Sequence, residues 1–181
     1  MKQRFEVILA GSGGQGLVLS GILLGEAAIL EGKNVVQTQS YGIASRGGFS
    51  QAEVIIDREE IIFQQVQSPD VVLVLTREAM EKYSLLAASV PVFYDTTLLD
   101  RQAGENFYGF PFTAMASELG HAGTANMIAL GVISALTGLV KPENLAKAID
   151  RRFSAEAARR NREALWLGVG MAGKERDNGG I

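Results

Sequence analysis

The first part of the chain alternates between two hydrophobic periods. Phe5–Ala10 is a short apolar run that ends at a glycine, which is typical of a buried parallel strand. Apolar residues recur at helical spacing through Leu17–Leu30, and Gly32 follows where a helix is expected to end. Val35–Gln39 has the composition of a second strand. This order predicts a strand, a glycine loop, a helix and a strand, that is, one βαβ unit.

The middle of the chain predicts three further strands and a helix. Ser50–Asp57 alternates between apolar and polar residues, as a half-exposed strand does, and Asp70–Leu75 is the nearly continuous aliphatic run of a central strand. Thr76 is placed to cap a helix over Arg77–Ala88. Val90–Tyr94 is a further strand.

The last third predicts only helices and completes the fold class. The expectation is an α/β, Rossmann-like three-layer domain with a mainly parallel sheet and a helical C-terminal part. Residues 1–172 are expected to form this single domain, and 173–181 a polar, frayed tail. The predicted helices are Phe112–Glu118, Ala125–Leu136, Pro142–Ile149 and Ser154–Leu167.

Composition excludes several kinds of site. The chain has 181 residues, of which 47% are hydrophobic and 20% charged, with a net charge of −3. A negative net charge argues against a protein that binds nucleic acid through phosphate contacts. Because no cysteine occurs, the chain can form no disulfide, thiolate zinc site, cysteine nucleophile or cysteine-held iron–sulfur cluster.

Nothing in the sequence predicts a membrane segment. The apolar run Val7–Ala10 is too short for the apolar region of a signal peptide, and no stretch approaches the length of a membrane-spanning helix. A cytoplasmic protein without membrane contact is expected.

A glycine loop between the first strand and the first helix is the first candidate site. Gly11, Gly13 and Gly16 have the spacing of a dinucleotide-binding loop, in which backbone N–H groups and a helix N-terminus face an anion. A nicotinamide site also needs an acidic residue at the end of the second strand, and "VVQTQSYG" offers none. No P-loop lysine follows the glycines. A tight turn that only brings helix and sheet together remains the alternative.

A second candidate segment, "QSYGIASRGG" at 39–48, follows the next strand. Ligand crevices form beyond the carboxyl ends of strands in an open α/β sheet. Glycine permits unusual backbone conformations, and the guanidinium of Arg46 suits phosphate or carboxylate. A surface loop with a solvated arginine is the alternative.

Taken together, these segments resemble the γ subunit of 2-oxoacid:ferredoxin oxidoreductases, most closely the 2-oxoglutarate branch. The resemblance covers nearly the whole chain, in five stretches that keep their order. They are "GSGGQGLVLSGILLGEAA" at 11–28, "QSYGIASRGG" at 39–48, "SPDVVLVLTREAMEKY" at 68–83, "NMIALG" at 126–131 and "NREALWLG" at 161–168.

The resemblance implies a subunit that is inactive alone. Members of this family decarboxylate a 2-oxoacid on thiamine diphosphate and magnesium, pass electrons through iron–sulfur clusters to ferredoxin, and release an acyl-coenzyme A. This chain has neither cysteine nor the "GDG" start of a thiamine diphosphate motif, so no catalytic residue, metal or cofactor is assigned to it alone. The expected partners are the α, β and cluster-carrying δ subunits in a hetero-oligomer, with a homodimer for the isolated chain.

The resemblance also implies that the two glycine segments border the coenzyme A path. One departure from the family loop is noted: its usual proline and glutamate before the arginine are Ile43 and Ala44 here. Two alternatives stay open, namely a free-standing nucleotide- or flavin-binding module and a purely architectural subunit. The candidate residues for the coenzyme A border are Gly13, Gly14, Gln15, Gly16, Tyr41, Ser45, Arg46 and Gly47.

Three further features have structural interpretations. His121 is a lone histidine without a positioned carboxylate or serine partner and is taken as structural or exposed. Asn126 is expected to cap or cross-link a helix end. The arginines between positions 151 and 162 are read as a solvated basic face, with an acidic partner surface as the alternative.

Overall fold

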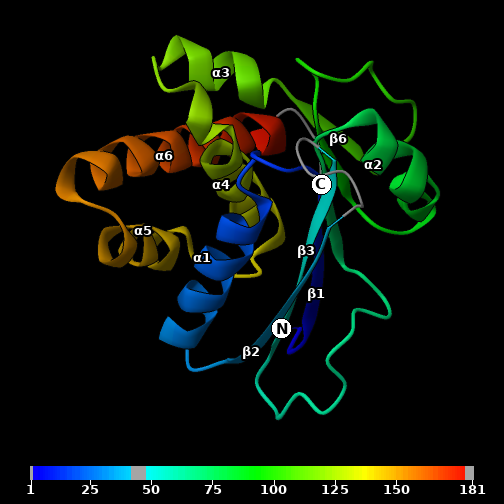
Figure 1. Cartoon of the computed structure of the whole chain (residues 1–181). Coiled ribbons are helices and arrows are strands. Elements are labelled where there is room, and N and C mark those ends of the chain that lie inside the picture. The colour runs from blue at the N-terminus through cyan, green and yellow to red at the C-terminus, as the bar shows by residue number, and fades with distance from the viewer. Residues whose placement is uncertain (1, 42–47, 178–181) are drawn as a thin grey trace.

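The core of the fold is a six-stranded mixed sheet with the strand order β2-β3-β1-β4-β5-β6. Helices cover both of its faces, and one face carries more of them than the other (Figure 1). The structure is a computed structural model, and it describes residues 2–41 and 48–177. The strands are β1 (Phe5–Ser12), β2 (Asn34–Tyr41), β3 (Phe49–Asp57), β4 (Val71–Val74), β5 (Val92–Asp95) and β6 (Phe107–Phe110). The helices are α1 (Leu17–Leu30), α2 (Arg77–Tyr83), α3 (Phe112–Glu118), α4 (Ala125–Thr137), α5 (Pro142–Arg152) and α6 (Ala155–Asp177), with 3-10 helices η1 (Ser84–Ala88) and η2 (Ala122–Thr124).

Strand direction confirms the α/β class and adds one reversal. β1, β4, β5 and β6 run parallel to one another, whereas β3 is antiparallel to both of its neighbours. The predicted β1–α1–β2 unit is present, but β2 does not lie beside β1. Instead β3 inserts between them, and Val7 pairs with Val54 while Gln37 pairs with the same Val54 from the other side.

Two apolar clusters hold the layers together. The larger one joins α1 and α3–α6 to one face of the sheet, through residues such as Leu9, Leu73 and Phe93. The smaller one packs α2 and η1 on the opposite face, over β1, β4 and β5 (Figure 1). Since successive side chains of a strand point to opposite faces, Leu9 belongs to the first cluster and Ile8 to the second.

Local signals placed several helix ends correctly. The Thr76 hydroxyl accepts a hydrogen bond from the N–H of Ala79 at 3.3 Å, which confirms the predicted cap of α2. Gly32 adopts φ +73°, the left-handed conformation expected after α1. Pro142 occupies the first turn of α5, where its missing N–H has no cost.

Some elements differ from the expectation. The helix expected over Arg77–Ala88 is α-helical only to Tyr83 and continues as the 3-10 helix η1 over Ser84–Ala88. β6 was not predicted, because its four residues are too few for a period and include Gly109. α6 extends to Asp177, so Gly173–Asp177 of the expected tail is helical, and 178–181 lie outside the described residues. Alanine, lysine, glutamate and arginine are strong helix formers, and they occur together at 172–176.

Candidate functional site

The glycine loop lies where β1 ends and α1 begins. Gly14 and Gly16 have φ of +93° and +74°, a left-handed conformation that residues with a Cβ rarely adopt. Gly16 is the N-cap of α1 and supplies no side-chain cap, so the N–H groups of the first turn are open to an external acceptor. The turn can therefore receive an anion.

Gln15 fastens this loop to the sheet. Its amide oxygen accepts a hydrogen bond from the N–H of Ser12 at 2.8 Å, and its amide nitrogen donates to the carbonyl of Leu75 at 3.2 Å. The loop thus connects the carboxyl ends of β1 and β4. These adjacent strands send α1 and α2 to opposite faces of the sheet, and such a divergence is the usual position of a ligand crevice in α/β proteins.

The structure brings the two predicted glycine segments together at their ends. The N–H of Gly13 donates to the carbonyl of Gly48 at 3.0 Å. Tyr41 pairs with Ser50 of β3, which in turn pairs with Gly11 of β1. Tyr41 is 64% exposed at the end of β2. The predicted residues Ser45, Arg46 and Gly47, together with Ile43 and Ala44, lie outside the described residues.

Asn126 connects α4 to the start of α1. Its amide nitrogen donates to the carbonyl of Gly16 at 3.2 Å and to the hydroxyl of Ser20 at 3.3 Å. A Cβ on Gly16 would lie 2.4 Å from this nitrogen, so the contact requires glycine there. The predicted cross-linking role of Asn126 is confirmed.

The other end of this amide is an unpaired acceptor. Asn126 is 3% exposed, and its Oδ1 is buried without a hydrogen-bond partner among the described residues. A buried polar atom of this kind needs a donor to offset its lost hydration. Asn126 lines a cavity of about 140 Å³, which is also bordered by Gly14, Gln15, Asp95 and Thr113. Asn126 thus borders the cavity, while its Oδ1 is enclosed by the surrounding packing.

Asp95, at the end of β5, fixes another wall of this cavity. One carboxylate oxygen accepts from the N–H of Thr97 at 2.9 Å. The other accepts from both the N–H and the hydroxyl of Thr113, at 3.0 and 2.6 Å. Asp95 is 1% exposed, and all these donors are internal, so its carboxylate anchors the first turn of α3. No local sequence pattern points to Asp95, because its partner lies in another element.

A wider cleft lies on the helical side of Asn126. It measures about 470 Å³, and Leu19, Met127 and Phe153 contribute apolar walls while His121 and Arg160 contribute polar ones. Within the described part of the chain, no group of three or more histidine, cysteine, aspartate or glutamate side chains could hold a metal ion.

A larger cavity, about 930 Å³, lies elsewhere, between the β5–β6 connection and Glu175. None of the described candidate residues lines it. Burial, together with Glu175 and Glu105, raises the pKa of Tyr108 there. This cavity lies at the β6 edge of the sheet and is therefore separate from the glycine loop.

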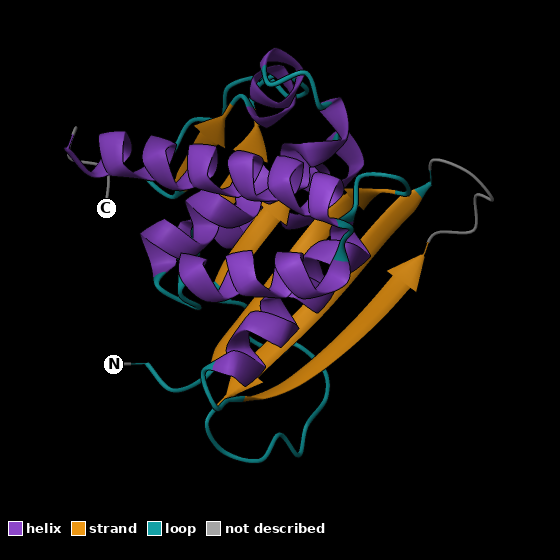
Figure 2. Ribbon diagram, turned by 90° about the vertical axis from the view of Figure 1, so that its left-hand side faces the viewer, coloured by secondary structure: helices purple, strands orange, loops and turns teal. Residues whose placement is uncertain are grey.

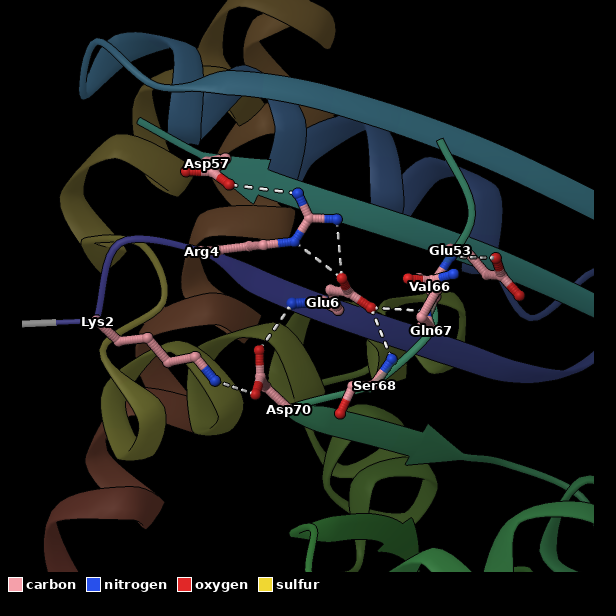
Figure 3. Close-up of polar contacts among 9 residues, drawn as sticks. All are labelled: Lys2, Arg4, Glu6, Glu53, Asp57, Val66, Gln67, Ser68 and Asp70. Atoms are coloured by element: carbon pink, nitrogen blue, oxygen red, sulfur yellow. Dashed lines mark hydrogen bonds and ion pairs between the residues drawn. The ribbon is translucent and has the colours of Figure 1, made fainter. Parts of the chain in front are cut away.

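A buried ionic cluster occupies the amino end of β1 (Figure 3). The Glu6 carboxylate accepts from the N–H groups of Gln67 and Ser68 at 2.7 and 2.9 Å, and it pairs with Arg4. Burial raises the pKa of Glu6, but the hydrogen bonds from Ser68, Gln67 and Arg4 outweigh it and leave the pKa below its ordinary value. Every partner is internal, so this cluster stabilises the fold and is separate from the candidate site.

The basic face of α5 and α6 is largely neutralised within the chain. Arg152 pairs with Glu26 at 2.9 Å, and Arg159 lies 4.0 Å from Glu163. Arg160 pairs with Glu156, and Arg162 with Asp150. These pairs favour the solvated face over a basic docking surface.

Comparison with known proteins supports the resemblance. Residues 6–171 match the family described as pyruvate ferredoxin/flavodoxin oxidoreductase. The chain is 40% identical over 173 residues to the 2-oxoglutarate synthase subunit KorC of Archaeoglobus fulgidus, which covers 94% of this chain and 89% of the relative. It is 33% identical over 170 residues to the pyruvate/ketoisovalerate oxidoreductases common subunit gamma of Pyrococcus furiosus, covering 88% and 92%.

A solved structure has the same architecture. The keto/oxoacid ferredoxin oxidoreductase gamma subunit from Geobacter sulfurreducens superposes with a TM-score of 0.81 at 36% identity, covering 94% of this chain and 99% of that one. In the described ranges of the present chain, no helix has the length and apolar character needed to cross a membrane.

Proposed function

The chain belongs to the pyruvate ferredoxin/flavodoxin oxidoreductase family, and we propose that it is the γ subunit of an enzyme that oxidatively decarboxylates 2-oxoglutarate, releasing carbon dioxide and an acyl-coenzyme A, with ferredoxin as the electron acceptor. The observation that carries this proposal is similarity over nearly the full length of relatives that are themselves subunits. The 2-oxoglutarate synthase relative is 40% identical, compared with 33% for the pyruvate/ketoisovalerate relative.

The oxoacid itself would be selected mainly by other chains. The Pyrococcus furiosus relative is named as a subunit common to pyruvate and ketoisovalerate oxidoreductases. One such chain therefore serves two oxoacids. In the assembled enzyme, thiamine diphosphate on a partner supplies the carbanion chemistry, and clusters on cysteine-bearing partners carry the electrons, since this chain has no cysteine.

The part left to this chain is the border of the coenzyme A path. Gly13, Gly14, Gln15 and Gly16 would present backbone N–H groups and the N-terminus of α1 to a phosphate. Asn126 would hold this turn in place through its hydrogen bonds to Gly16 and Ser20. We place Tyr41, Ser45, Arg46 and Gly47 on the same border.

The two alternatives are less well supported. A nucleotide or flavin module of the dinucleotide type needs an acid at the end of β2, where Gln39, Ser40 and Tyr41 stand. A purely architectural subunit predicts a coenzyme A dependence that does not change when Arg46 is substituted.

Co-expression with the thiamine- and cluster-bearing chains, and purification through a tag on this chain, tests the proposal. We expect a complex that oxidises 2-oxoglutarate with coenzyme A and a viologen or ferredoxin acceptor. Recovery of the chain alone with a bound nucleotide would refute it. In that complex, Arg46→Ala should raise the KM for coenzyme A and leave kcat nearly unchanged. Arg58→Ala, at an exposed loop position, is the matched control. Equal coenzyme A dependence in both variants would favour an architectural role.

A further inference from the structure

One outer edge of the sheet is formed by β2, a strand of 8 residues (Figure 2). Its pairing with β3 is one-to-one from Asn34 opposite Asp57 to Tyr41 opposite Ser50, without a bulge. Among the described residues, no hydrogen bond reaches a backbone group of β2 from outside β3. Alternate N–H and C=O groups along its free side therefore lack a protein partner.

The β2 edge has none of the features that usually prevent an edge strand from pairing with a strand of another chain. Natural edge strands are kept apart by charged residues, proline, bulges or short length. β2 reads "NVVQTQSY", with no charged residue and no proline. The opposite edge, β6, has only 4 residues and includes a glycine. The exposed half of β2 ends at Tyr41, a large aromatic side chain that is 64% exposed.

The sequence of β2 is complementary to itself in the antiparallel direction. Opposite residues of an antiparallel pair share a face, so a two-fold axis must pass through a residue position. With the axis at Thr38, the threonines of the two copies face each other, and Gln37 faces Gln39 of the second copy. Val36 then faces Ser40, and Val35 faces Tyr41. Threonine pairs and aromatic–β-branched pairs are favourable across strands, and no like charges meet.

The side chains of β2 that face α1 are compatible with this register. The amide of Gln37 donates to the carbonyl of Val18, and Val35 lies against Gly25, so both side chains face α1. Tyr41, at the same parity, shares that face. The Tyr41 ring of one copy would then cover the Val35 region of the other and lose its exposure to water.

We propose that β2 pairs antiparallel with β2 of a second copy of this chain, centred on Thr38, so that two six-stranded sheets become continuous. The proposal does not rest on the proposed function, although both involve Tyr41, at the end of β2. A strand from a different subunit is the competing occupant, and the experiment separates the two.

Sedimentation equilibrium of the full chain at micromolar concentrations tests the pairing. We expect a reversible dimer. Thr38→Lys and Thr38→Glu should each weaken it about tenfold or more, because like charges would meet at the axis. An equimolar mixture of the two variants should restore a heterodimer. Gln64→Lys and Gln64→Glu change the same charges at an exposed loop position and should leave the dimer intact.

A cysteine scan gives an independent readout, because the chain has no cysteine of its own. Directly opposite residues of antiparallel strands have Cα atoms about 4.5–5.5 Å apart, within the range that a disulfide spans. Thr38→Cys should form a cross-linked dimer on mild oxidation, and Gln64→Cys should not.

A monomer at every concentration, or a dimer indifferent to Thr38, would overturn the proposal. So would Thr38 variants that leave the chain monomeric and reduce only its recovery with partner subunits, since that result assigns the edge to another chain.

Discussion

Gly131 of α4 and Gly168 of α6 lie at a crossing where the two helix backbones touch. A Cβ on Gly131 would lie 2.1 Å from the carbonyl oxygen of Leu165, and one on Gly168 would lie 2.1 Å from that of Ile128. Real Cβ atoms do not approach backbone this closely, so each glycine permits the other helix to pack. These two glycines end the motifs "NMIALG" and "NREALWLG".

Gly131→Ala or Gly168→Ala should therefore force the helices apart. We expect each to lower the free energy of unfolding by about 1–3 kcal/mol, as overpacking of a core does. The control is Gly170→Ala, also on α6, where a Cβ would meet nothing within 4 Å. It should be neutral or raise stability by about 0.5–1 kcal/mol, since alanine is the better helix former. Urea unfolding followed by circular dichroism measures all three, and equal losses at 168 and 170 would contradict the crossing.

The contact between Gly16 and Asn126 predicts an energetic coupling. Gly16→Ala would place a residue with a Cβ in a left-handed backbone conformation and would also bring that Cβ within 2.4 Å of the Asn126 amide nitrogen. Gly14→Ala would have the same backbone strain but no close contact. The backbone part costs about 1–2 kcal/mol in each. Gly16→Ala should be the less stable variant, and Asn126→Ala should reduce the difference between them. A double-mutant cycle on unfolding free energies tests this, and strict additivity would show that the two residues do not press on each other.

Acid sensitivity is expected to arise at two carboxylates far from the candidate site. Burial raises the pKa of Glu31, but hydrogen bonds from Lys141, Lys33 and Asn144 outweigh it, so its pKa lies below 4.5, as does that of Glu6. Because each pKa is lower in the folded chain, the unfolded chain takes up protons first as the pH falls. The contribution of these two carboxylates to the free energy of unfolding is therefore complete above their ordinary pKa of 4.5. It is lost as the pH falls from there through their lower folded pKa.

Glu6→Gln separates this contribution from general acid effects. The variant should lose about 1.5–3 kcal/mol at neutral pH, because charged hydrogen bonds to Gln67 and Ser68 are weakened, and it should show a shallower decline in acid. Glu118→Gln, at an exposed position at the end of α3, is the control. The test is the denaturant midpoint of each variant measured across the acid pH range. If the midpoints of Glu6→Gln and of the unaltered chain fell in parallel with decreasing pH, Glu6 would not have the role described.

The anchoring role of Asp95 gives a last prediction. Both carboxylate oxygens of Asp95 accept hydrogen bonds, from Thr97 and from Thr113. In Asp95→Asn, either orientation of the amide therefore places its NH₂ group against one of these donors and loses that hydrogen bond. We expect a loss of about 1–3 kcal/mol and faster amide hydrogen exchange in the first turn of α3. Asp100→Asn, whose side chain is 95% exposed, should change neither quantity. Unaltered exchange in α3 would assign the loss to the β5 turn instead.

Local signals in the sequence determined much of the fold and part of the site. α1 begins and ends at the predicted residues, Leu17 and Leu30, and Thr76 caps α2, because helix periodicity and capping depend on residues within one or two turns. The glycine loop was predictable for the same reason. The residues before and after it already define a strand, a turn and a helix.

Tertiary structure decided what joins distant segments. Nothing local distinguishes Gly131 and Gly168 from Gly170, and only the crossing of α4 with α6 shows which glycines a second backbone requires. β3 inserts between β1 and β2 because strand order is set by which edges pair after folding. Asn126 reaches Gly16 across 110 positions, and its second amide atom is left unpaired by packing. Such contacts depend on distances in space, which the periods of a sequence do not encode.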